Sequence, residues 1–343
     1  MKYALQQLRH AASTLRKKLA RRVLNWRLRK QPQTEVIAAE RRLRGKEQLA
    51  RLREADIVVV SFGKSGRTWL RVMLSHLFRI RHDLPENALL GFDNFHNMNP
   101  AVPRIFFTHD NYIKDVIDDP QSKAPFYDKP VVLMARDPRD VAVSQFFQWQ
   151  FRLKPNKVTL NNYPPRDRDV SLFEFVTGDN DGGSMQAVIG YLNAWAAESS
   201  KIARFHLLRY EDLRAEPHAE LSRLLDFMQV DATAEEQAAA IAHASYENMK
   251  KMEGADTFRF TGRMRARDRD NPDSYKVRRA KVGGYRDYFN DEEAAAIDRQ
   301  LAESLDPLYG YGCARNTEQD PQRSSHLASL HRRVVNTSCF AAH

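Results

Sequence analysis

The chain has 343 residues, of which 42% are hydrophobic and 29% charged. This length can bury a sizeable core, and the composition is that of a soluble globular protein rather than a disordered or fibrous one. No apolar run approaches the roughly 18 residues that a membrane span needs, and no signal peptide pattern is present. Two cysteines, Cys313 and Cys339, are too few for a disulfide framework or a metal site. We therefore expect a cytoplasmic protein without a metal.

The net charge of +10 belongs to the N-terminal arm. Residues 1–30 contain ten Lys and Arg and no Asp or Glu, which leaves 44 basic and 44 acidic residues in the remaining chain. Because the body is balanced, a general nucleic-acid-binding face is disfavoured. Apolar residues of the arm recur at steps of three or four, at Leu5, Leu8, Ala12, Leu15, Leu19, Val23 and Trp26.

Such spacing predicts a basic amphipathic helix over residues 1–30. A helix of this kind is expected to lie on an anionic membrane surface, which would place the protein at the inner face of the membrane. Docking on the body and pairing with another subunit are the alternatives. The oligomeric state is left open.

Strand and helix patterns alternate along the body. Apolar runs predict buried strands at 56–62, 104–108, 130–135 and 205–208. Helical patterns are expected at 35–54, from 69 to 77, after 138, at 171–176, 184–199, 234–244 and 291–305, and up to 228 after the fourth strand. Loops are expected at 83–103 and 156–169, and a flexible basic segment at 256–282.

This alternation predicts an α/β fold. We expect a single P-loop-like domain with a central parallel sheet flanked by helices on both faces, and ligands at the carboxyl ends of the strands. The expected organisation is a basic arm and lead-in over 1–54, the domain over 55–315 and a disordered tail over 316–343.

The turn after the first strand carries the first sign of chemistry. Gly63 and Gly66 bracket a Lys-Ser pair, and a helical pattern begins directly afterwards. Strand, glycine turn and helix start aim backbone N–H groups at an anion, and Lys64 adds a full positive charge. We predict a phosphate-binding loop; an ordinary turn that uses glycine for its φ is the alternative. The nucleotide-triphosphatase pattern G-x-x-x-x-G-K-[ST] fails, because its first glycine would fall at Val58.

Two segments resemble motifs of the cytosolic-type sulfotransferases. The stretch 61–70, S-F-G-K-S-G-R-T-W-L, resembles their 5′-phosphosulfate loop P-K-S-G-[TR]-T-W, with Gly63 in place of the leading proline. The stretch 136–144, R-D-P-R-D-V-A-V-S, resembles their 3′-phosphate motif R-[DN]-x-[RK]-D-x-x-x-S. An arginine fork beside a helix start suits a dianionic phosphate; a surface ion network in an Arg- and Asp-rich turn is the alternative. The resemblance covers about residues 55 to 310.

The resemblance implies a donor and a product. These are 3′-phosphoadenosine-5′-phosphosulfate (PAPS) and 3′-phosphoadenosine-5′-phosphate (PAP). Tyr210 in Y-E-D is similar to the tyrosine that lies by the adenine in that family. Ser245-Tyr246-x-x-Met249 resembles S-F-x-x-M, whose aromatic ring stacks on the adenine.

A late motif also matches in part. The stretch 278–286 is similar to R-K-G-x-x-G-D-W-K. Ala280 replaces the first Gly of this motif, Gly284 its Asp and Tyr285 its Trp. Ala280 stands where a glycine conformation is expected. The cofactor-binding residues that the resemblance implies are Lys64, Ser65, Gly66, Arg67, Thr68, Trp69, Arg136, Ser144, Tyr210, Ser245, Tyr246, Arg278, Arg279 and Ala280.

Three residues are expected to carry the reaction. Sulfuryl transfer is an in-line displacement in which the acceptor oxygen loses a proton, and His109, after the second strand, is suited to take it. The resemblance equates His109 with the family's K-T-H base. A packed strand-end histidine is the alternative, and His96 is the reserve candidate. Lys64 is expected to stabilise the leaving phosphate oxygen. By resemblance, Ser144 holds Lys64 off the cofactor until the acceptor binds.

The acceptor is expected to be a hydroxyl. A lipid or lipid-linked glycan is favoured if the arm lies on a membrane, and a small molecule is second. Segments 83–103 and 151–185 are expected to shape its pocket, with aromatic lining from Phe92, Phe95, Phe146, Phe147, Trp149 and Phe151.

Two other functions remain as alternatives. They are a P-loop kinase or NTPase and a non-catalytic, membrane-tethered PAP-binding adaptor. The family's dimer motif K-x-x-x-T-V-x-x-x-E is not reproduced after the late motif, so that dimer is not expected.

Overall fold

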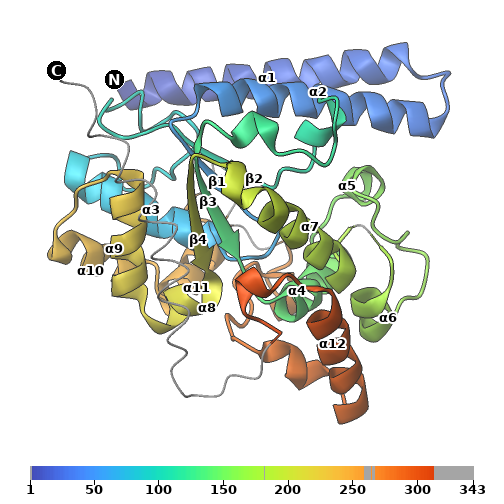
Figure 1. Cartoon of the computed structure of the whole chain (residues 1–343). Helices are drawn as coiled ribbons and strands as arrows, with labels where there is room; N and C mark the ends of the chain where they lie inside the picture. The colour runs from blue at the N-terminus through green and yellow to red at the C-terminus, as the bar shows by residue number, and fades with distance from the viewer. Residues whose placement is uncertain (1, 181, 259–263, 265–266, 313–343) are drawn as a thin grey trace, which may run out of the picture.

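The computed structural model describes residues 2–180, 182–258, 264 and 267–312. In the first helix, side chains are described at Ala12 and from Leu15 onward. The predicted tail 316–343, and residues 259–263 and 265–266 of the predicted basic segment, lie outside this part. Four parallel strands form one sheet in the order β2-β1-β3-β4 (Figure 1). Their bounds are β1 (Ile57–Val60), β2 (Ile105–Thr108), β3 (Pro130–Ala135) and β4 (Arg204–Arg209).

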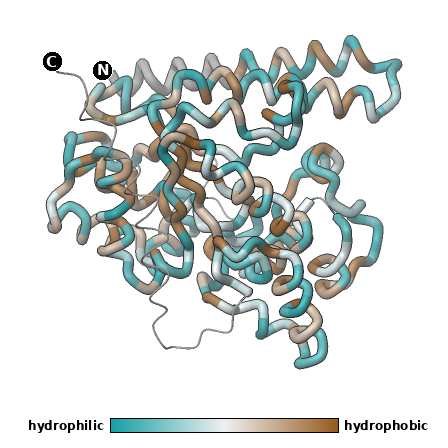
Figure 2. Tube along the Cα trace, viewed as in Figure 1, coloured by the Kyte–Doolittle hydropathy of each residue, from teal (hydrophilic) through white to brown (hydrophobic). Residues whose placement is uncertain are grey.

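The central strand shows why these short apolar runs became strands. Val58 of β1 lies opposite Phe106 of β2 on one side and Val131 of β3 on the other. Successive side chains of a strand point to opposite faces. Accordingly, Ile57 and Val59 enter one core, whereas Val58 and Val60 enter the other. Both faces of the sheet are therefore buried, as a continuous β-branched run predicts. Figure 2 shows the hydrophobic residues gathered along these strands.

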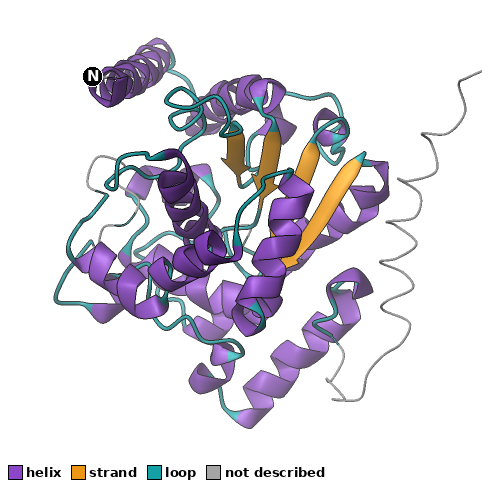
Figure 3. Ribbon diagram, turned by 90° about the vertical axis from the view of Figure 1, so that its left-hand side faces the viewer, coloured by secondary structure: helices purple, strands orange, loops and turns teal. Residues whose placement is uncertain are grey.

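Helices cover both faces of the sheet, as predicted (Figures 1 and 3). The first core includes side chains of α3, α9 and α10, and the second includes those of α4, α7 and α12. The helices after the arm are α2 (Gln33–Glu54), α3 (Arg67–His82), α4 (Pro138–Phe151), α5 (Pro155–Leu160), α6 (Leu172–Thr177), α7 (Met185–Glu198), α8 (Tyr210–Ala215), α9 (Pro217–Met228), α10 (Ala234–His243), α11 (Tyr246–Gly254) and α12 (Asp291–Ser304).

The helices differ from the sequence predictions at three places. The loop expected at 156–169 begins as α5, because Pro155 suits a first helical position and Val158 is buried. The helix expected to end at 228 is α9, and a separate short helix, α8, precedes it, because Glu216 before Pro217 leaves the helical region (φ −129°). Helix α11 was missed, since its sequence is mostly polar and charged and gives little apolar spacing.

The arm forms the predicted helix, α1 (Lys2–Arg27), which runs beside α2 at the edge of the molecule (Figure 1). Arg21 pairs with Glu47 of α2 at 2.9 Å. Where its side chains are described, from Leu15 to Trp26, the apolar stripe does not dock on the body: Leu15 is 67% exposed, Leu19 58% and Trp26 65%. Within the described part of the chain, no helix combines the length and the apolarity needed to cross a bilayer.

Candidate active site

The carboxyl ends of β1, β2 and β3 open into one cavity of about 1570 Å³. An α/β sheet binds ligands at this edge. The cavity is lined by most of the predicted site residues: Lys64, Gly66, Arg67, Thr68, Trp69, His109, Arg136, Ser144, Tyr210, Tyr246, Arg278, Arg279 and Ala280.

Two predicted cofactor-binding residues do not line the cavity. Ser65 is buried in the turn, with 2% of its surface exposed. Ser245 is the N-cap of α11, where its hydroxyl accepts a hydrogen bond from the backbone N–H of Asn248. Ser245 therefore has a structural role that orients the helix carrying Tyr246.

The turn between β1 and α3 depends on glycine at Gly66. Gly66 caps α3 with φ 96°, and a Cβ there would lie 2.6 Å from a ring carbon of Tyr210. At Gly63 a Cβ would meet only the amide end of the Gln145 side chain, which can move aside. Lys64 itself has φ 73°, a left-handed conformation that costs a non-glycine residue about 1–2 kcal/mol. Backbone strain of this kind is frequent at functional sites.

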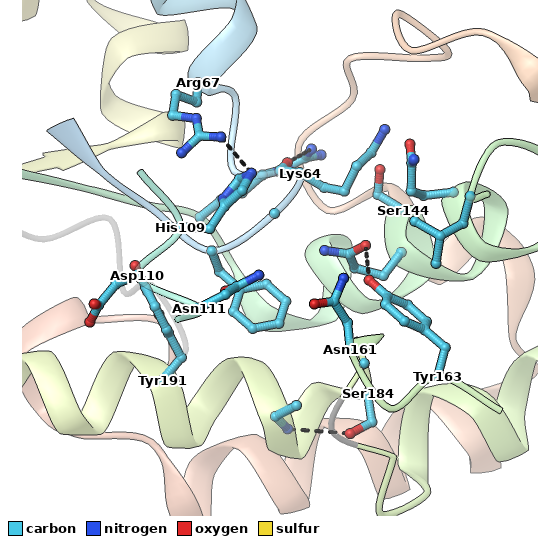
Figure 4. Close-up of a pocket in the computed structure, with 18 of the residues that line it drawn as sticks. Lys64, Arg67, His109, Asp110, Asn111, Ser144, Asn161, Tyr163, Ser184 and Tyr191 are labelled. Atoms are coloured by element: carbon cyan, nitrogen blue, oxygen red, sulfur yellow. Dashed lines mark hydrogen bonds between the residues drawn. The ribbon is translucent and has the colours of Figure 1, made fainter. Parts of the chain in front are cut away.

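Lys64 lies among positive charges. Burial, reinforced by Arg152 and Arg136, lowers its pKa from 10.5 to about 7. Desolvation disfavours an ammonium ion, and each neighbouring guanidinium repels it. The attraction of a dianionic ligand would offset both effects, so the turn is electrostatically suited to a phosphate. Figure 4 shows Lys64 and Ser144 directed into the same part of the cavity.

Arg136 joins three of the predicted motifs. Its guanidinium donates to the carbonyl of Lys64 at 3.3 Å and to that of Lys281 at 3.1 Å. It pairs with Asp140 at 3.4 Å and lies 4.4 Å from the ring centroid of Tyr210. Its Nε is buried and has no hydrogen-bond partner among the described residues. Arg136 therefore lies at the point where the segments meet, with its guanidinium lining the cavity.

The late motif is fixed against the start of α4. Asp140 accepts hydrogen bonds from the backbone N–H groups of Gly283 and Tyr285, both at 2.9 Å. Ala280 adopts φ 51°, so this alanine takes the glycine-like conformation in spite of its Cβ. Arg278 lies 3.6 Å above the ring of Phe147, whereas Arg279 is half exposed and pairs with Asp287 at 2.9 Å.

Three aromatic side chains form the part of the cavity where an adenine is expected. Trp69 meets Tyr210 edge to face, with ring centroids 5.5 Å apart, and its Nε1 donates to the carbonyl of Ala244 at 2.9 Å. The hydroxyl of Tyr246 donates to the carbonyl of Arg278 at 2.9 Å. Aromatic faces held in this way are suited to stack on a base.

His109 is held in one tautomer. Its Nδ1 lies 2.8 Å from the carbonyl of Ser61, so Nδ1 carries the proton and donates. Its Nε2 therefore accepts, and Nη2 of Arg67 lies 2.5 Å away (Figure 4). Burial and the neighbouring Arg67 charge hold the pKa of His109 well below its usual value. The imidazole is thus neutral at pH 7, the protonation state that a general base requires.

The reserve candidate His96 does not line this cavity; its Nδ1 lies 2.9 Å from the carbonyl of Val102. Within the described residues, no group of three or more His, Cys, Asp or Glu is arranged to share a metal ion.

The far half of the cavity differs from the prediction. None of the six aromatic residues expected there lines it; Phe95 and Trp149 are fully buried in the cores. The stretch 83–103 contributes no lining residue, whereas 151–185 does. The wall is mixed: apolar side chains such as Ile117 and Ala194 lie beside amide and hydroxyl groups, which belong to Asn111, Gln145, Gln148, Asn161, Asn162, Tyr163, Asn180, Ser184, Gln186 and Tyr191.

Helix α2 was missed as part of this wall. It contributes Thr34, Ile37, Ala38, Arg41 and Arg42. Arg41 fixes α2 in place by donating to the carbonyls of Leu160, at 2.9 Å, and Asn111, at 3.0 Å. No spacing within α2 could reveal this role, because it depends on where the helix packs.

The sulfotransferase domain model matches residues 54–308 of the chain. The chain belongs to this family. It is a PAPS-dependent sulfotransferase, with PAPS as sulfuryl donor and PAP as product.

Cytosolic sulfotransferase 3 of Arabidopsis thaliana is 27% identical over 267 residues, which cover 74% of this chain and 77% of the relative. Flavonol 4′-sulfotransferase of Flaveria chlorifolia is 24% identical, covering 76% of this chain and 82% of the relative. The crystal structure of mouse sulfotransferase SULT7A1 complexed with PAP has a TM-score of 0.49 and 20% identity, covering 73% of this chain and 84% of that chain.

Proposed function

We propose that the sulfuryl group passes from PAPS to a hydroxyl of the acceptor, with His109 as base and Lys64 at the leaving phosphate. One observation carries this proposal: Lys64, His109 and Arg136 come from three adjacent strand ends and line the same cavity. The three elements are parallel neighbours in the sheet, so their ends converge without any loop having to reach across.

The donor would lie with its 5′-phosphosulfate on the turn from Gly63 to Thr68. The backbone N–H groups at the start of α3 and the Lys64 ammonium would bind its oxygens. Arg136, Ser144 and Arg278 would bind the 3′-phosphate, since all three line the cavity and a guanidinium suits a phosphate. The aromatic rings of Trp69, Tyr210 and Tyr246 would hold the adenine, since all three line the cavity.

Each catalytic side chain then has one task. Nε2 of His109 accepts the proton of the acceptor hydroxyl as the acceptor oxygen attacks sulfur in line. The bond between sulfur and the bridging phosphate oxygen breaks. Lys64 stabilises the negative charge that develops on the leaving phosphate. Its pKa is lowered in the free protein because the ammonium is buried beside positive charges. Ser144 would hold the Lys64 ammonium until the acceptor is in place.

The acceptor would be a hydroxyl of a lipid headgroup or of a lipid-linked glycan, with a small molecule as second choice. The amide-rich wall of the far half supports a polyhydroxylated group more than an aromatic one, because amides satisfy hydroxyls by donating and accepting. Curated relatives carry the name cytosolic sulfotransferase, which supports a cytoplasmic location.

Helix α1 supports a place on the inner face of the membrane. The exposed stripe comprises Leu15, Leu19, Val23 and Trp26. At 100° per residue, the exposed Arg22 and Arg27 fall on opposite flanks of this stripe. An apolar stripe with basic flanks matches an anionic bilayer, which each basic residue near the surface favours by about 1 kcal/mol.

Vesicle flotation tests this surface. We expect the protein to float with vesicles of phosphatidylglycerol and phosphatidylcholine more than with pure phosphatidylcholine. The variant Leu19→Gln with Trp26→Gln should lose most of that binding. Ala20→Gln, an exposed change beside the stripe, should keep it. Equal flotation of all three proteins, or a loss of dimer rather than of vesicle binding in the double variant, contradicts the membrane assignment.

A labelling experiment tests the transfer. Wild-type protein, Lys64→Ala and His109→Ala are incubated with ³⁵S-PAPS and separate lipid, glycan and small-molecule extracts. We expect label to enter the lipid or glycan fraction with the wild type only. Label in no fraction, together with PAP binding, would support the non-catalytic alternative.

A further inference from the structure

The atom of His109 that should act as base is already engaged. Nη2 of Arg67 donates to its Nε2 across 2.5 Å, and Nδ1 is committed to the Ser61 carbonyl (Figure 4). An acceptor hydroxyl needs the same lone pair on Nε2. Because a guanidinium does not give up its proton in proteins, Arg67 cannot relay the proton onward. While this contact persists, His109 cannot serve an acceptor.

Arg67 is placed where a donor would act on it. It is the first residue of α3, directly after Gly66, and so belongs to the same turn as Lys64. Its side chain nevertheless points to the end of β2, away from the start of its own helix (Figure 4). The turn is built to hold a dianion, and a bidentate phosphate contact is stronger than a single hydrogen bond to an imidazole.

Among the residues that the structure describes, the charged groups that act on His109 are positive. Arg71 of α3 and Lys276 of the late segment add positive charge near the ring. The neighbouring carboxylate, Asp110, is buried and paired with Lys123 at 2.8 Å. The phenol of Tyr191 on α7 lines the same wall, and burial raises its pKa, so it stays neutral. An incoming phosphosulfate would therefore be the strongest anion within reach.

We propose that Arg67 caps the catalytic base and that the donor's 5′-phosphosulfate draws it away, so that donor binding uncaps His109. This inference rests on the proposed function. It makes Arg67 a positioning residue that acts through His109, and it makes transfer ordered, with PAPS bound before the acceptor is activated. When the donor is absent, the capped His109 cannot deprotonate an acceptor. An acceptor is therefore not activated before a sulfuryl group is present.

Histidine NMR tests the cap without needing the acceptor. Protein labelled with ¹⁵N-histidine is titrated with and without PAP, and His109→Gln assigns the signal. We expect His109 of the wild type to remain neutral at pH 6, with its proton on Nδ1 and its Nε2 lone pair accepting from Arg67. Arg67→Ala should raise its titration midpoint by about one pH unit, since a cation at hydrogen-bond distance has been removed.

The response to PAP separates the cap from a general charge effect. PAP should raise the titration midpoint of His109 in the wild type and in Arg67→Ala, because its negative charge lies near the ring. The rise should be at most half as large in Arg67→Ala, because that variant has no cap for PAP to remove. Lys276→Ala removes a nearby charge that makes no contact with Nε2 in the cap, and should keep the full rise. Arg67→Lys provides a second variant if the alanine protein fails to fold.

Equal midpoints in wild type and Arg67→Ala, or equal PAP responses, would overturn the cap. Both readouts are independent of turnover. A failed ³⁵S transfer with the expected NMR result would count against the proposed function alone, whereas normal transfer with unchanged midpoints would count against the cap alone.

Discussion

The two halves of the cavity are built in different ways. In the donor half, short stretches of chain at the ends of β1 and β3 supply the turn around Lys64 and the Arg136–Ser144 segment, and Asp140 ties the late motif to them. In the acceptor half, the wall is assembled from α2, α5, α7 and loops that are distant in sequence. The proposed donor half concentrates positive charge, whereas the proposed acceptor half mixes amides and hydroxyls with charged residues such as Arg41 and apolar ones such as Ile37. The first arrangement suits a dianionic ligand, and the second suits a ligand with both polar and apolar groups.

Removing the base should have the largest effect. His109→Ala is expected to lower transfer from ³⁵S-PAPS by about 10²–10⁴-fold, because general base catalysis contributes that much. PAP affinity, measured by calorimetry, should change little, because the base belongs to the transfer step. His96→Gln is the control and should retain activity, because His96 does not line the cavity. A His96 effect as large as that of His109 would refute the assignment.

One substitution in each half sharpens the comparison. Arg136→Gln should weaken PAP by about 10–100-fold but AMP only slightly, because a charged hydrogen bond to the 3′-phosphate is lost. Gln186→Ala, an exposed change on α7 in the acceptor wall, should leave the Kd of PAP unchanged and raise the KM of the acceptor several-fold. If Gln186→Ala weakens PAP as much as Arg136→Gln does, the two halves are not separate.

The positive charge around Lys64 should also make the free energy of unfolding depend on pH. With the pKa of Lys64 near 7 when folded and 10.5 when unfolded, the unfolded chain binds more protons between these values. Stability of ligand-free protein therefore rises with pH across that interval, and the full penalty applies below about pH 7.

Lys64→Met removes this penalty. Its free energy of unfolding at pH 6.5 should exceed that of the wild type by a few kcal/mol, and the gap should close toward pH 10. PAP should close it as well, by stabilising the wild type. A gap that is the same at pH 6.5 and pH 10 contradicts this account of the site.

Ala280→Gly should have the smallest effect. Because Ala280 adopts φ 51°, glycine is expected to relieve strain of about 1 kcal/mol, partly offset by its greater freedom when unfolded. PAP affinity should change by no more than a few-fold. Destabilisation by more than 1 kcal/mol in urea unfolding would mean that the Cβ of Ala280 makes a contact of its own.

The comparison also explains what the sequence could reveal. Four strands, a parallel sheet and the donor residues follow from local patterns, because the Lys64 turn and the Arg136–Ser144 segment lie within single strand–helix units. The acceptor wall depends on packing between distant segments. The residue spacing in α2 does not predict that Arg41 donates to the carbonyl of Leu160. The contact between Arg67 and His109 joins the ends of two strands, so it too required the fold.

Departures from the family motifs became interpretable only in three dimensions. Gly63 in place of proline lies beside the amide end of Gln145, a flexible contact that does not by itself require glycine. Ala280 in place of glycine keeps the left-handed conformation that the motif implies. The expected aromatic acceptor pocket was wrong because Phe95 and Trp149 are needed in the cores.

The most direct test of the donor half is a calorimetric comparison of nucleotides on the wild-type protein. PAP, AMP and ATP are titrated, each with and without magnesium. We predict that PAP binds at least ten-fold more tightly than AMP and that magnesium makes no difference to PAP, because Lys64, Arg136 and Arg278 supply the charge that two phosphates need. Tighter binding of ATP in the presence of magnesium, or no discrimination between PAP and AMP, would contradict the two-phosphate site.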